Sequence, residues 1–520
     1  MSDIPRIAAK PGRAVLIFAV AYVIMSIAAC GEPDTSRRSN PVSPQSSEDP
    51  AQRGGVYRVP LMQTPATLDP ASVRDLYGEA VIHQVFDGLV QFGPYLTVLP
   101  ALAESWQLDD NGRRIRFFIR EEARFHNGRL VTAEDARYSL TRLLRVDPPP
   151  AILPHLLKID GALAYRNHES EQVQGLQCPR ERELVVRLTQ PHAPFLSALA
   201  MYQASIVPAE NVEGVHARFA EKPVGTGPFH FASWENRVIS LKRYDWYFTG
   251  KAFMDEIQFH LYPGSRIDEV MVDFKRGQLE EMPHFLGVQE NLSGDKAYRR
   301  VHRPSLSLFF YGINTRHPLL KHPEIRKALS LAIDRSVITR EVYNDQFEAA
   351  HSVLPPGMPA YQRLDDLTRF DLSAARESIR KFGPGSTTKG WELEIVSGSS
   401  SDFAKKELEI IRRSWRPLGI ELKTKFISEW SQFERYVQSD SVQLYRYAWN
   451  ADLPDPDSFF HPLFASDSPV NFGRYTDAGA DRMISEALAI VEPVERAIKY
   501  QQIERYILNQ YPNIHMFYIS

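Results

Sequence analysis

Strand-like and helix-like patterns alternate along the chain, and this alternation limits the possible folds more than any other feature. The segment RIRFFIR places Ile115, Phe117 and Ile119 on one side at a spacing of two, which is typical of a half-buried strand. A turn and a predicted helix follow, with Thr132 at the N-cap position and Asp135 three residues later in a capping-box arrangement. Repeated alternation of this kind predicts an α/β fold with several linked sheets.

Three longer segments continue the alternation. ELVVRLTQPHAPF predicts a strand that ends before Pro191, and HPEIRKALSLAIDRSVITREVY predicts one long helix with Pro323 in its first turn. SDFAKKELEIIRRSWRPLGIELKTKFI predicts a helix, a turn at Pro417 and Gly419, and a strand. The apolar stripe of that last helix consists of Leu408, Ile411 and Trp415.

Length and charge narrow the class of protein. A chain of 520 residues exceeds the roughly 250 to 300 at which single hydrophobic cores stop growing, so two or three domains are expected. The formal net charge is −3, and no basic domain or stripe indicates a nucleic-acid partner. No internal repeat is visible, which argues against a solenoid or a propeller.

The N-terminus has the pattern of an export signal. Arg6, Lys10 and Arg13 precede AVLIFAVAYVIMSIAAC, whose apolar run has the length of a signal-peptide core and is short for a membrane span. The run ends in Ile-Ala-Ala-Cys, which resembles the lipobox of bacterial lipoproteins. We therefore expect residues 1–29 to be a lipoprotein signal peptide and Cys30 to be lipidated. A plain N-terminal anchor helix is the alternative, and both place the rest of the protein outside the cytoplasm.

The segment after the apolar run differs from the rest of the chain. Residues 30–53 contain many Pro, Ser and charged side chains and few apolar ones, which predicts a disordered tether. The chain has two cysteines, so a lipidated Cys30 leaves Cys178 without an intrachain disulfide partner.

The common catalytic and metal-binding signatures do not occur in the sequence. There is no HExxH and no GxSxG, and GPGSTTKG at 383–390 lacks the spacing of a phosphate-binding loop. The 15 histidines contain no pair at the spacing of a helical zinc site. Asp452, Asp455 and Asp457 do not match the ligand positions of an EF-hand. We predict no catalytic residues, no metal ligands and no cofactor, so the chain is not expected to be an enzyme.

Six stretches in order resemble one known family. They are GGVYRVPLMQTPATLDPA, FHNGRLVTAEDARYSL, KPVGTGPFHFASW, FYGINTRHPLLKHPEIRKALSLAIDR, SVLPPGMPAY and WNADLPDPDSFF. Together they are similar to the family 5 extracellular solute-binding proteins, the oligopeptide- and dipeptide-binding lipoproteins of ABC importers. The resemblance runs from about residue 54 to the C-terminus.

The resemblance implies a two-lobed periplasmic-binding-protein fold of type II, built like the three-domain cluster C proteins, with a hinge and an interlobe cleft. Domain I would comprise 54–90, 206–305 and a final part at 506–520 that is shortened relative to the family. Domain II would comprise 91–205, and domain III, the second lobe, 306–505. In the returning part of domain I, the glycines of VGTGPF are expected to allow a tight backbone turn.

The resemblance also implies a ligand site in RYAWNADLPDPDSFF. In peptide receptors of this family, the Asp of a WxxD motif binds the ligand's α-ammonium, and Asp452 matches it after Trp449. Arg446, six residues before Asp452, matches an Arg that can meet the ligand's carboxylate. A zwitterionic peptide needs such a pair of opposite charges. The alternatives are that Asp452 caps the following turn, that Arg446 forms an internal salt bridge, and that Trp449, on the opposite strand face, belongs to the core.

The expected function is therefore that of a lipid-anchored, monomeric receptor that binds short peptides and passes them to an ABC permease. A receptor of the same fold for a nickel chelate, haem, a sugar or an opine is the first alternative. A peptide or cell-wall hydrolase and a shortened relative without a transport role are the others.

Overall fold

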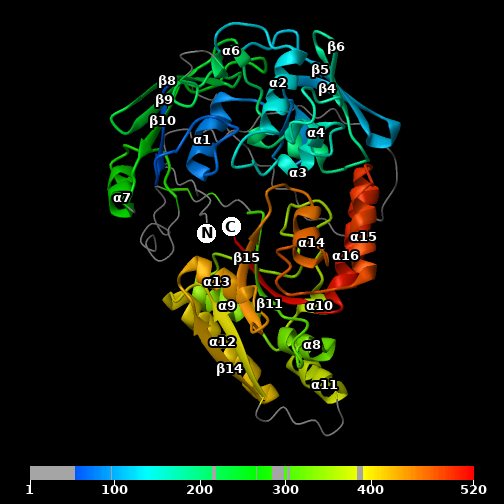
Figure 1. The fold of residues 1–520 in the computed structure, drawn as a ribbon. Helices are drawn as coiled ribbons and strands as arrows, with labels where there is room; N and C mark the ends of the chain where they lie inside the picture. The colour runs from blue at the N-terminus through cyan, green and yellow to red at the C-terminus, as the bar shows by residue number, and fades with distance from the viewer. Residues whose placement is uncertain are drawn as a thin grey trace, which may run out of the picture.

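The computed structural model describes residues 53–94, 96–213, 218–264, 266–283, 298–299, 301, 305–382 and 391–519. It contains an upper and a lower lobe, each built of sheets and helices (Figure 1), which confirms the predicted two-lobed α/β fold. The signal peptide, Cys30, nearly all of the tether and the GPGSTTKG segment lie outside the described residues. Within the described part, no helix combines the length and the apolar character needed to cross a membrane.

The upper lobe contains two four-stranded sheets and a small two-stranded one. The first sheet has the order β1-β10-β9-β8, with β1 parallel to β10 and the other pairs antiparallel. Its elements are β1 (Val56–Leu61), β8 (Phe229–Glu235), β9 (Val238–Arg243), β10 (Glu256–Leu261), α1 (Leu76–Val85), α6 (Ala209–Val212) and α7 (Ile267–Lys275). Residues from both ends of the upper-lobe sequence thus form one sheet and one core.

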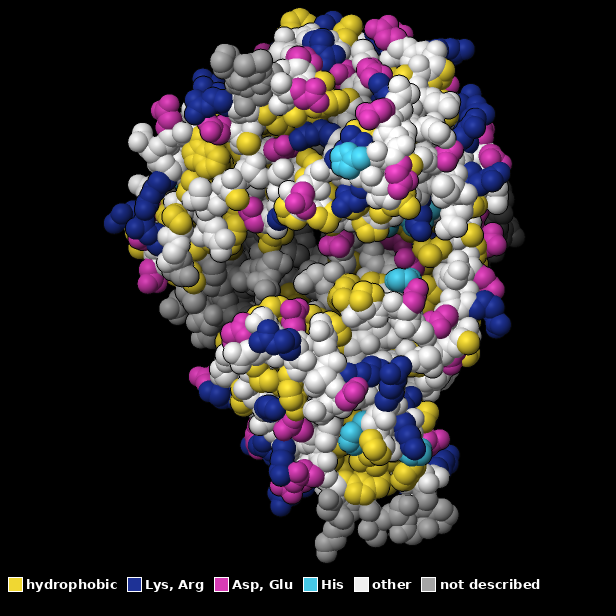
Figure 2. Space-filling view, viewed as in Figure 1, with side chains coloured by type: hydrophobic (Ala, Val, Ile, Leu, Met, Phe, Trp, Pro, Cys, Tyr) yellow, Lys and Arg dark blue, Asp and Glu magenta, His cyan; other side chains and the backbone are white. Residues whose placement is uncertain are grey.

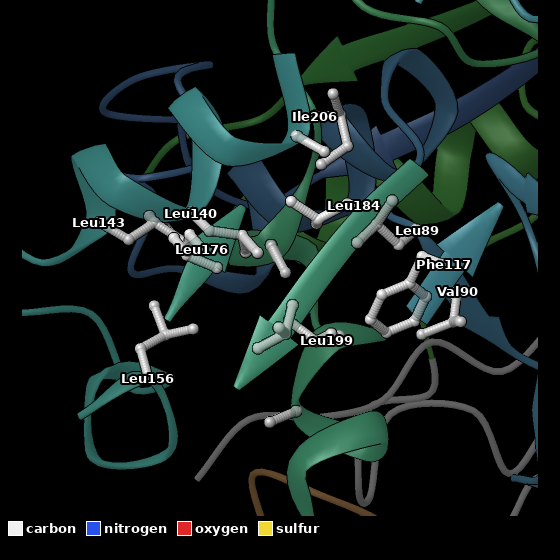
Figure 3. Packing of buried hydrophobic residues seen from close by; sticks show 14 of the residues in the cluster. Leu89, Val90, Phe117, Leu140, Leu143, Leu156, Leu176, Leu184, Leu199 and Ile206 are labelled. Atoms are coloured by element: carbon white, nitrogen blue, oxygen red, sulfur yellow. The ribbon is translucent and has the colours of Figure 1, made fainter. Parts of the chain in front are cut away.

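The second sheet of the upper lobe is antiparallel, with the order β4-β5-β7-β6. Its strands are β4 (Ala103–Asp109), β5 (Arg114–Ile119), β6 (Leu176–Arg180) and β7 (Glu183–Arg187), and β2 (Val90–Phe92) pairs separately with β3 (Val98–Pro100). The helices are α2 (Ala133–Leu143), α3 (Leu153–Leu156), α4 (Ala162–Arg166) and α5 (Phe195–Leu199). Figure 3 shows Leu140 of α2 and Phe117 of β5 in the core between them. The alternating burial along β5 confirms the predicted strand.

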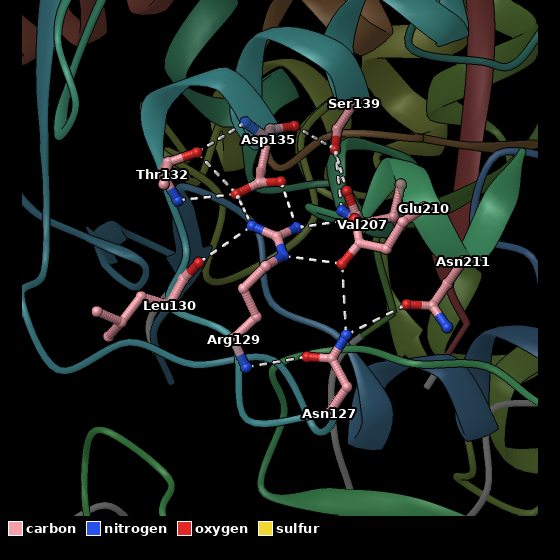
Figure 4. A network of polar contacts seen from close by, with 9 residues as sticks. All are labelled: Asn127, Arg129, Leu130, Thr132, Asp135, Ser139, Val207, Glu210 and Asn211. Carbon is pink, nitrogen blue, oxygen red and sulfur yellow. Dashed lines mark hydrogen bonds and ion pairs between the residues drawn. The ribbon is translucent and has the colours of Figure 1, made fainter.

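A polar network fixes the start of α2. Thr132 and Asp135 form the predicted capping box. Arg129 joins the Asp135 carboxylate through bonds of 2.7 and 2.9 Å and also binds Glu210 of α6 at 2.8 Å (Figure 4). The network connects α2, which packs on the second sheet, to α6, which lies in the chain segment that returns to the first sheet.

The lower lobe is organised around one six-stranded sheet, in the order β12-β16-β11-β15-β13-β14. Its strands are β11 (Ser307–Ile313), β12 (Glu348–Ala349), β13 (Trp391–Ser397), β14 (Ile420–Phe426), β15 (Leu444–Asn450) and β16 (Asn513–Tyr518). The helices are α8 (Pro323–Leu331), α9 (Arg335–Tyr343), α10 (Asp365–Thr368), α11 (Leu372–Phe382), α12 (Asp402–Trp415), α13 (Trp430–Val437), α14 (Asp457–Phe464), α15 (Ala478–Leu488) and α16 (Pro493–Leu508). Every residue of β11 and β16 is buried, because helices cover both faces of the sheet.

Three expectations differ from this structure. The long helix from Pro323 is two helices, because Asp334 begins a new one by accepting a hydrogen bond from the Ser336 amide at 3.0 Å. The final strand, β16, pairs with β11 and β12 of the lower lobe, whereas residues 506–520 were expected in domain I.

The third difference concerns the glycines of VGTGPF. Neither Gly225 nor Gly227 adopts the left-handed conformation, so a tight turn is not what requires them. A Cβ atom on Gly225 would lie 2.0 Å from the Val85 carbonyl oxygen, and one on Gly227 would lie 2.6 Å from that of Gln84. Glycine is needed here because two backbone segments approach each other too closely for any side chain.

Candidate ligand-binding site

The surface of the molecule is hollowed between the two lobes (Figure 2). The loop after β15 reaches across this boundary from the lower lobe. Leu453 in that loop is 1% exposed and belongs to the apolar core of the upper lobe, together with Leu199 and Met201. Asp452, the residue before it, therefore lies where the two lobes meet.

The side chain of Asp452 is solvent-exposed and has no hydrogen bond or ion pair with any other described residue. Although the side chain reaches solvent, the protein around the carboxyl group removes part of its hydration, which raises its pKa, and the negative charge of Glu79 raises it further. The following turn is capped by Asp455, whose Oδ1 accepts a hydrogen bond from the Asp457 amide at 2.9 Å. The capping role considered for Asp452 thus falls to Asp455.

The upper lobe places polar groups near Asp452 that the sequence patterns did not reveal. Glu79 lies on α1, where His83 approaches its Oε1 atom to 3.3 Å. The ring of His83 meets that of Tyr202 edge to face, with the centroids 6.0 Å apart. Burial, followed by the charge of Glu79, raises the pKa of Tyr202 to about 12, and Asp452 adds to the shift. Glu79 and Asp452 thus place two carboxylates at this end of the site, and Arg74 is the cation that opposes them.

Arg446 lies on β15 and is largely buried, with 9% of its side chain exposed. Its Nη2 and Nε atoms donate to Oε2 of Glu407 at 2.9 and 3.3 Å, and Nη2 also contacts the Tyr343 hydroxyl at 3.1 Å. The guanidinium lies 4.2 Å from the ring centre of Phe309. Burial lowers the pKa of Arg446, but the negative charge of Glu407 outweighs this effect, and the pKa lies above the ordinary value. These contacts are those of the internal salt bridge that the sequence left as an alternative.

The position of Glu407 explains this pairing. It lies on α12, which covers the face of the sheet to which Arg446 belongs, and its side chain is fully buried. The sequence contains an indication that Glu407 is buried, because it falls within the apolar stripe of the helix, next to Leu408 and four residues before Ile411. A carboxylate in such a stripe needs a buried partner.

Trp449 lies on the other face of β15, as strand alternation predicts, and packs against the hydrophobic core on that face of the lower-lobe sheet. Its indole Nε1 donates to the Ser458 carbonyl oxygen at 2.6 Å. Tyr447 lies on the same face, 6.0 Å from the ring of Trp430 on α13, which is 54% exposed. Figure 1 shows α13 at the end of the lower lobe that faces the upper one. The structure thus places the predicted residues Arg446 and Trp449 on opposite faces of one strand.

A second set of contacts joins the lobes beside this site. The Ala193 amide of the upper lobe donates to the Leu488 carbonyl of the lower lobe at 3.0 Å. Asp455 and Arg496, both of the lower lobe, form a buried two-point salt bridge of 2.6 and 2.8 Å, and the charges of both act on His192 of the upper lobe. We call these contacts, together with Leu453, the interlobe seam. Among the described residues, no group of three or more side chains is arranged to hold a metal ion.

Comparison with known proteins identifies the chain's family. The sequence model described as "Bacterial extracellular solute-binding proteins, family 5 Middle" matches residues 97–470. The chain belongs to this family. The recognition made from six short stretches is thereby confirmed.

Curated relatives of this family 5 solute-binding protein have several ligands in their names. The peptide transport periplasmic protein SapA of Salmonella typhimurium is 26% identical over 446 residues, which cover 82% of this chain and 80% of the relative. The probable di/tripeptide-binding protein 5 of Pseudomonas aeruginosa is 28% identical and covers 80% of each chain. The heme-binding protein A of Haemophilus influenzae is 24% identical and covers 96% of this chain and 92% of the relative.

Solved structures agree with the fold of this family 5 solute-binding protein. The murein tripeptide binding protein MppA in its unliganded open form matches with a TM-score of 0.78 at 22% identity, covering 90% of this chain and 92% of MppA. The Helicobacter pylori protein DppA in complex with the peptide STSA matches with a TM-score of 0.63 at 22% identity, covering 90% and 93%. At these identities the likeness supports the fold alone.

Proposed function

We propose that this family 5 solute-binding protein captures short peptides between its lobes and delivers them to the permease of an ABC importer. The observation that carries the proposal is the carboxylate of Asp452, which lies at the lobe boundary without a charge partner among the described residues. The terminal ammonium of a peptide supplies that partner through a charge-assisted hydrogen bond. The names of the peptide-binding relatives support the same ligand class.

In the proposed mechanism, the ammonium binds Asp452 while the aromatic rings of Trp449 and Tyr447 form a wall along the ligand. The peptide backbone binds in the manner of an added strand, so that affinity does not depend on one particular side chain. Contacts made to both lobes at once favour the conformation in which the lobes enclose the ligand. The protein then acts by binding alone, without a chemical step.

We further propose that Cys30 carries a lipid anchor after removal of residues 1–29, which holds the receptor at the outer side of a membrane. The support is the sequence pattern of an apolar core followed by Ile-Ala-Ala-Cys. In cells grown with labelled palmitate, we expect the wild-type protein to become labelled and a Cys30→Ala variant to remain unlabelled. Equal labelling of the two proteins would contradict the anchor.

Haem is the second candidate ligand, because the relative named heme-binding protein A aligns with 96% of the chain. Haem is a strongly absorbing ligand, so visible spectroscopy of the purified protein titrated with haem separates the two proposals. Saturable binding of haem that displaces peptides from the site would favour this alternative.

The peptide proposal is tested by native mass spectrometry of residues 31–520, purified without denaturation, with identification of the molecules released on unfolding. We expect a mixture of short peptides. In calorimetry with a released peptide, Asp452→Asn is expected to weaken binding by about 10- to 100-fold, since a charged hydrogen bond is lost. Asp440→Asn, which removes a fully exposed carboxylate of the lower lobe that lies 3.4 Å from Nη2 of Arg474, is the control for the loss of a negative charge away from the site. Unchanged affinity of the Asp452 variant would exclude the assigned role.

A further inference from the structure

The starting observation is the set of bonds that Glu407 accepts. Its Oε2 receives the Tyr343 hydroxyl at 2.6 Å and two nitrogens of Arg446, and its Oε1 receives the Tyr311 hydroxyl at 2.5 Å. Both tyrosines and Glu407 are buried. The guanidinium of Arg446 thus belongs to a closed polar cluster inside the lower lobe.

Because of this cluster, Arg446 can bind a ligand carboxylate only at a large cost in free energy. A carboxylate that drew the guanidinium away would leave Glu407 as an unpaired buried anion, which is far less favourable than the intact pair. Arg446 also faces the side of the sheet covered by α9 and α12, whereas Tyr447 and Trp449 face the other side. The ring of Phe309 further fixes the guanidinium in place.

The charges on the upper-lobe side of the site do not replace Arg446. Glu79 adds a negative charge near Asp452. Arg74, a cation near Tyr202, donates its terminal nitrogens to the carbonyl oxygens of Ala71, Val73 and Pro148 at 2.9, 2.7 and 2.8 Å. The electrostatic balance beside Asp452 therefore favours a cation and disfavours a carboxylate.

We infer that, among the residues that the structure describes, the site recognises a single ligand charge, the terminal ammonium, and that Arg446 does not bind the carboxyl end of the ligand. The substrate class is then peptides with a free N-terminus. Their C-terminus can be a free acid or an amide, or the chain can continue beyond the site. This inference rests on the proposed function, because it concerns the same site. It departs from the expectation that Arg446 and Asp452 clamp the two ends of a zwitterion.

The test uses three pools of random tripeptides that differ only at their ends: free acids, C-terminal amides and N-acetylated acids. Each pool is incubated with the purified receptor, and the retained peptides are quantified by mass spectrometry. We expect the amides to be retained within about threefold of the free acids, and the acetylated pool to fall by roughly 10- to 100-fold because its ammonium is absent.

The outcomes separate the inference from the proposed function. Retention of the free acids with at least about tenfold loss of the amides would overturn the inference alone, because the carboxylate would then be bound. Retention of none of the pools would overturn the proposed function and the inference with it. Equal retention of the acetylated and free pools would exclude recognition of the ammonium.

A pair of variants supplies an independent readout. Arg446→Met alone leaves Glu407 unpaired and can unfold the lobe, so the double variant Arg446→Met with Glu407→Leu removes both charges together. The folded double variant, checked by circular dichroism, is expected to retain the free acids within about threefold of the wild type. A loss of about tenfold or more for free acids, without a loss for amides, would show that Arg446 binds the carboxylate and would overturn the inference.

Discussion

Nδ1 of His155 lies 2.9 Å from Nε2 of His192 in the upper lobe, next to the salt bridge of Asp455 and Arg496 in the lower lobe. Burial lowers the pKa of His155 to about 4 and that of His192 to about 3. Asp455 opposes both shifts, whereas Lys158 adds to them. One ring donates to the other, so the pair is stable while both rings are uncharged.

The first prediction is that acidification destabilises the folded protein through the histidine pair beside the interlobe seam. Both histidines stay neutral in the folded protein, whereas in the unfolded chain they take up protons near pH 6.5, so the unfolded state binds more protons below that pH. Their contribution to stability is complete above about pH 7 and is lost as the pH falls from about 6.5 towards 4. For His155 alone the loss at pH 5 is on the order of 2 kcal/mol.

Thermal unfolding of the wild type and of His155→Gln/His192→Gln between pH 7.5 and 5 measures this effect. Burial raises the pKa of Asp457 to about 6, so this group stabilises the folded protein as the pH falls and opposes the effect of the histidines. The quantity to compare is therefore the difference in melting temperature between the wild type and the double variant. We expect that difference to narrow as the pH falls. A difference that is constant with pH would refute the prediction.

The second prediction concerns Leu453. Because this side chain is buried in the core of the other lobe, Leu453→Ala is expected to destabilise the protein by about 2–5 kcal/mol. Leu453→Met conserves volume and is expected to cost less than about 1.5 kcal/mol. Urea denaturation of both variants gives the comparison, and similar losses for the two would argue against a packing role.

The third prediction concerns the buried ion pair. Glu407→Ala is expected to cost about 3–5 kcal/mol of unfolding free energy, since it leaves Arg446 buried and unpaired. The double variant Glu407→Leu/Arg446→Met is expected to recover much of that loss. Guanidinium denaturation measures both. A single variant as stable as the wild type would mean that the pair is not needed for the fold.

The fourth prediction concerns the indole of Trp449. Trp449→Phe keeps a ring in the core but removes the hydrogen bond to the Ser458 carbonyl, at a cost of about 1 kcal/mol. Trp430→Phe, at an exposed position, is the matched control and is expected to change stability by less than about 0.5 kcal/mol. If the two variants melt at the same temperature, the Ser458 bond contributes nothing measurable.

Local patterns predicted much of the fold. The period of two in RIRFFIR predicted β5, and the capping box at Thr132 predicted the start of α2, because both depend on neighbours in sequence. The break between α8 and α9 was missed although Asp334 is a good N-cap residue, because the apolar stripe of α8 runs on beyond its end at Leu331.

The site depended on contacts that no local pattern encodes. Glu407 precedes Arg446 by 39 residues, and only the packing of α12 on the sheet brings their side chains together. Glu79 reaches the surroundings of Asp452 from the opposite lobe. The family motif indicated the position of Asp452, but a motif names one residue and not the charges that surround it in the fold.

The direct bond between Asp452 and Leu453 has a mechanical consequence. Successive Cα atoms are about 3.8 Å apart, so a residue anchored in the upper lobe keeps its neighbour close to that lobe. If the lobes swing apart about this point, Asp452 lies at the fulcrum and moves least. In the proposed receptor, the ligand's ammonium would then bind before the lobes close, and the rest of the lower lobe would move over a peptide that is already held at one end.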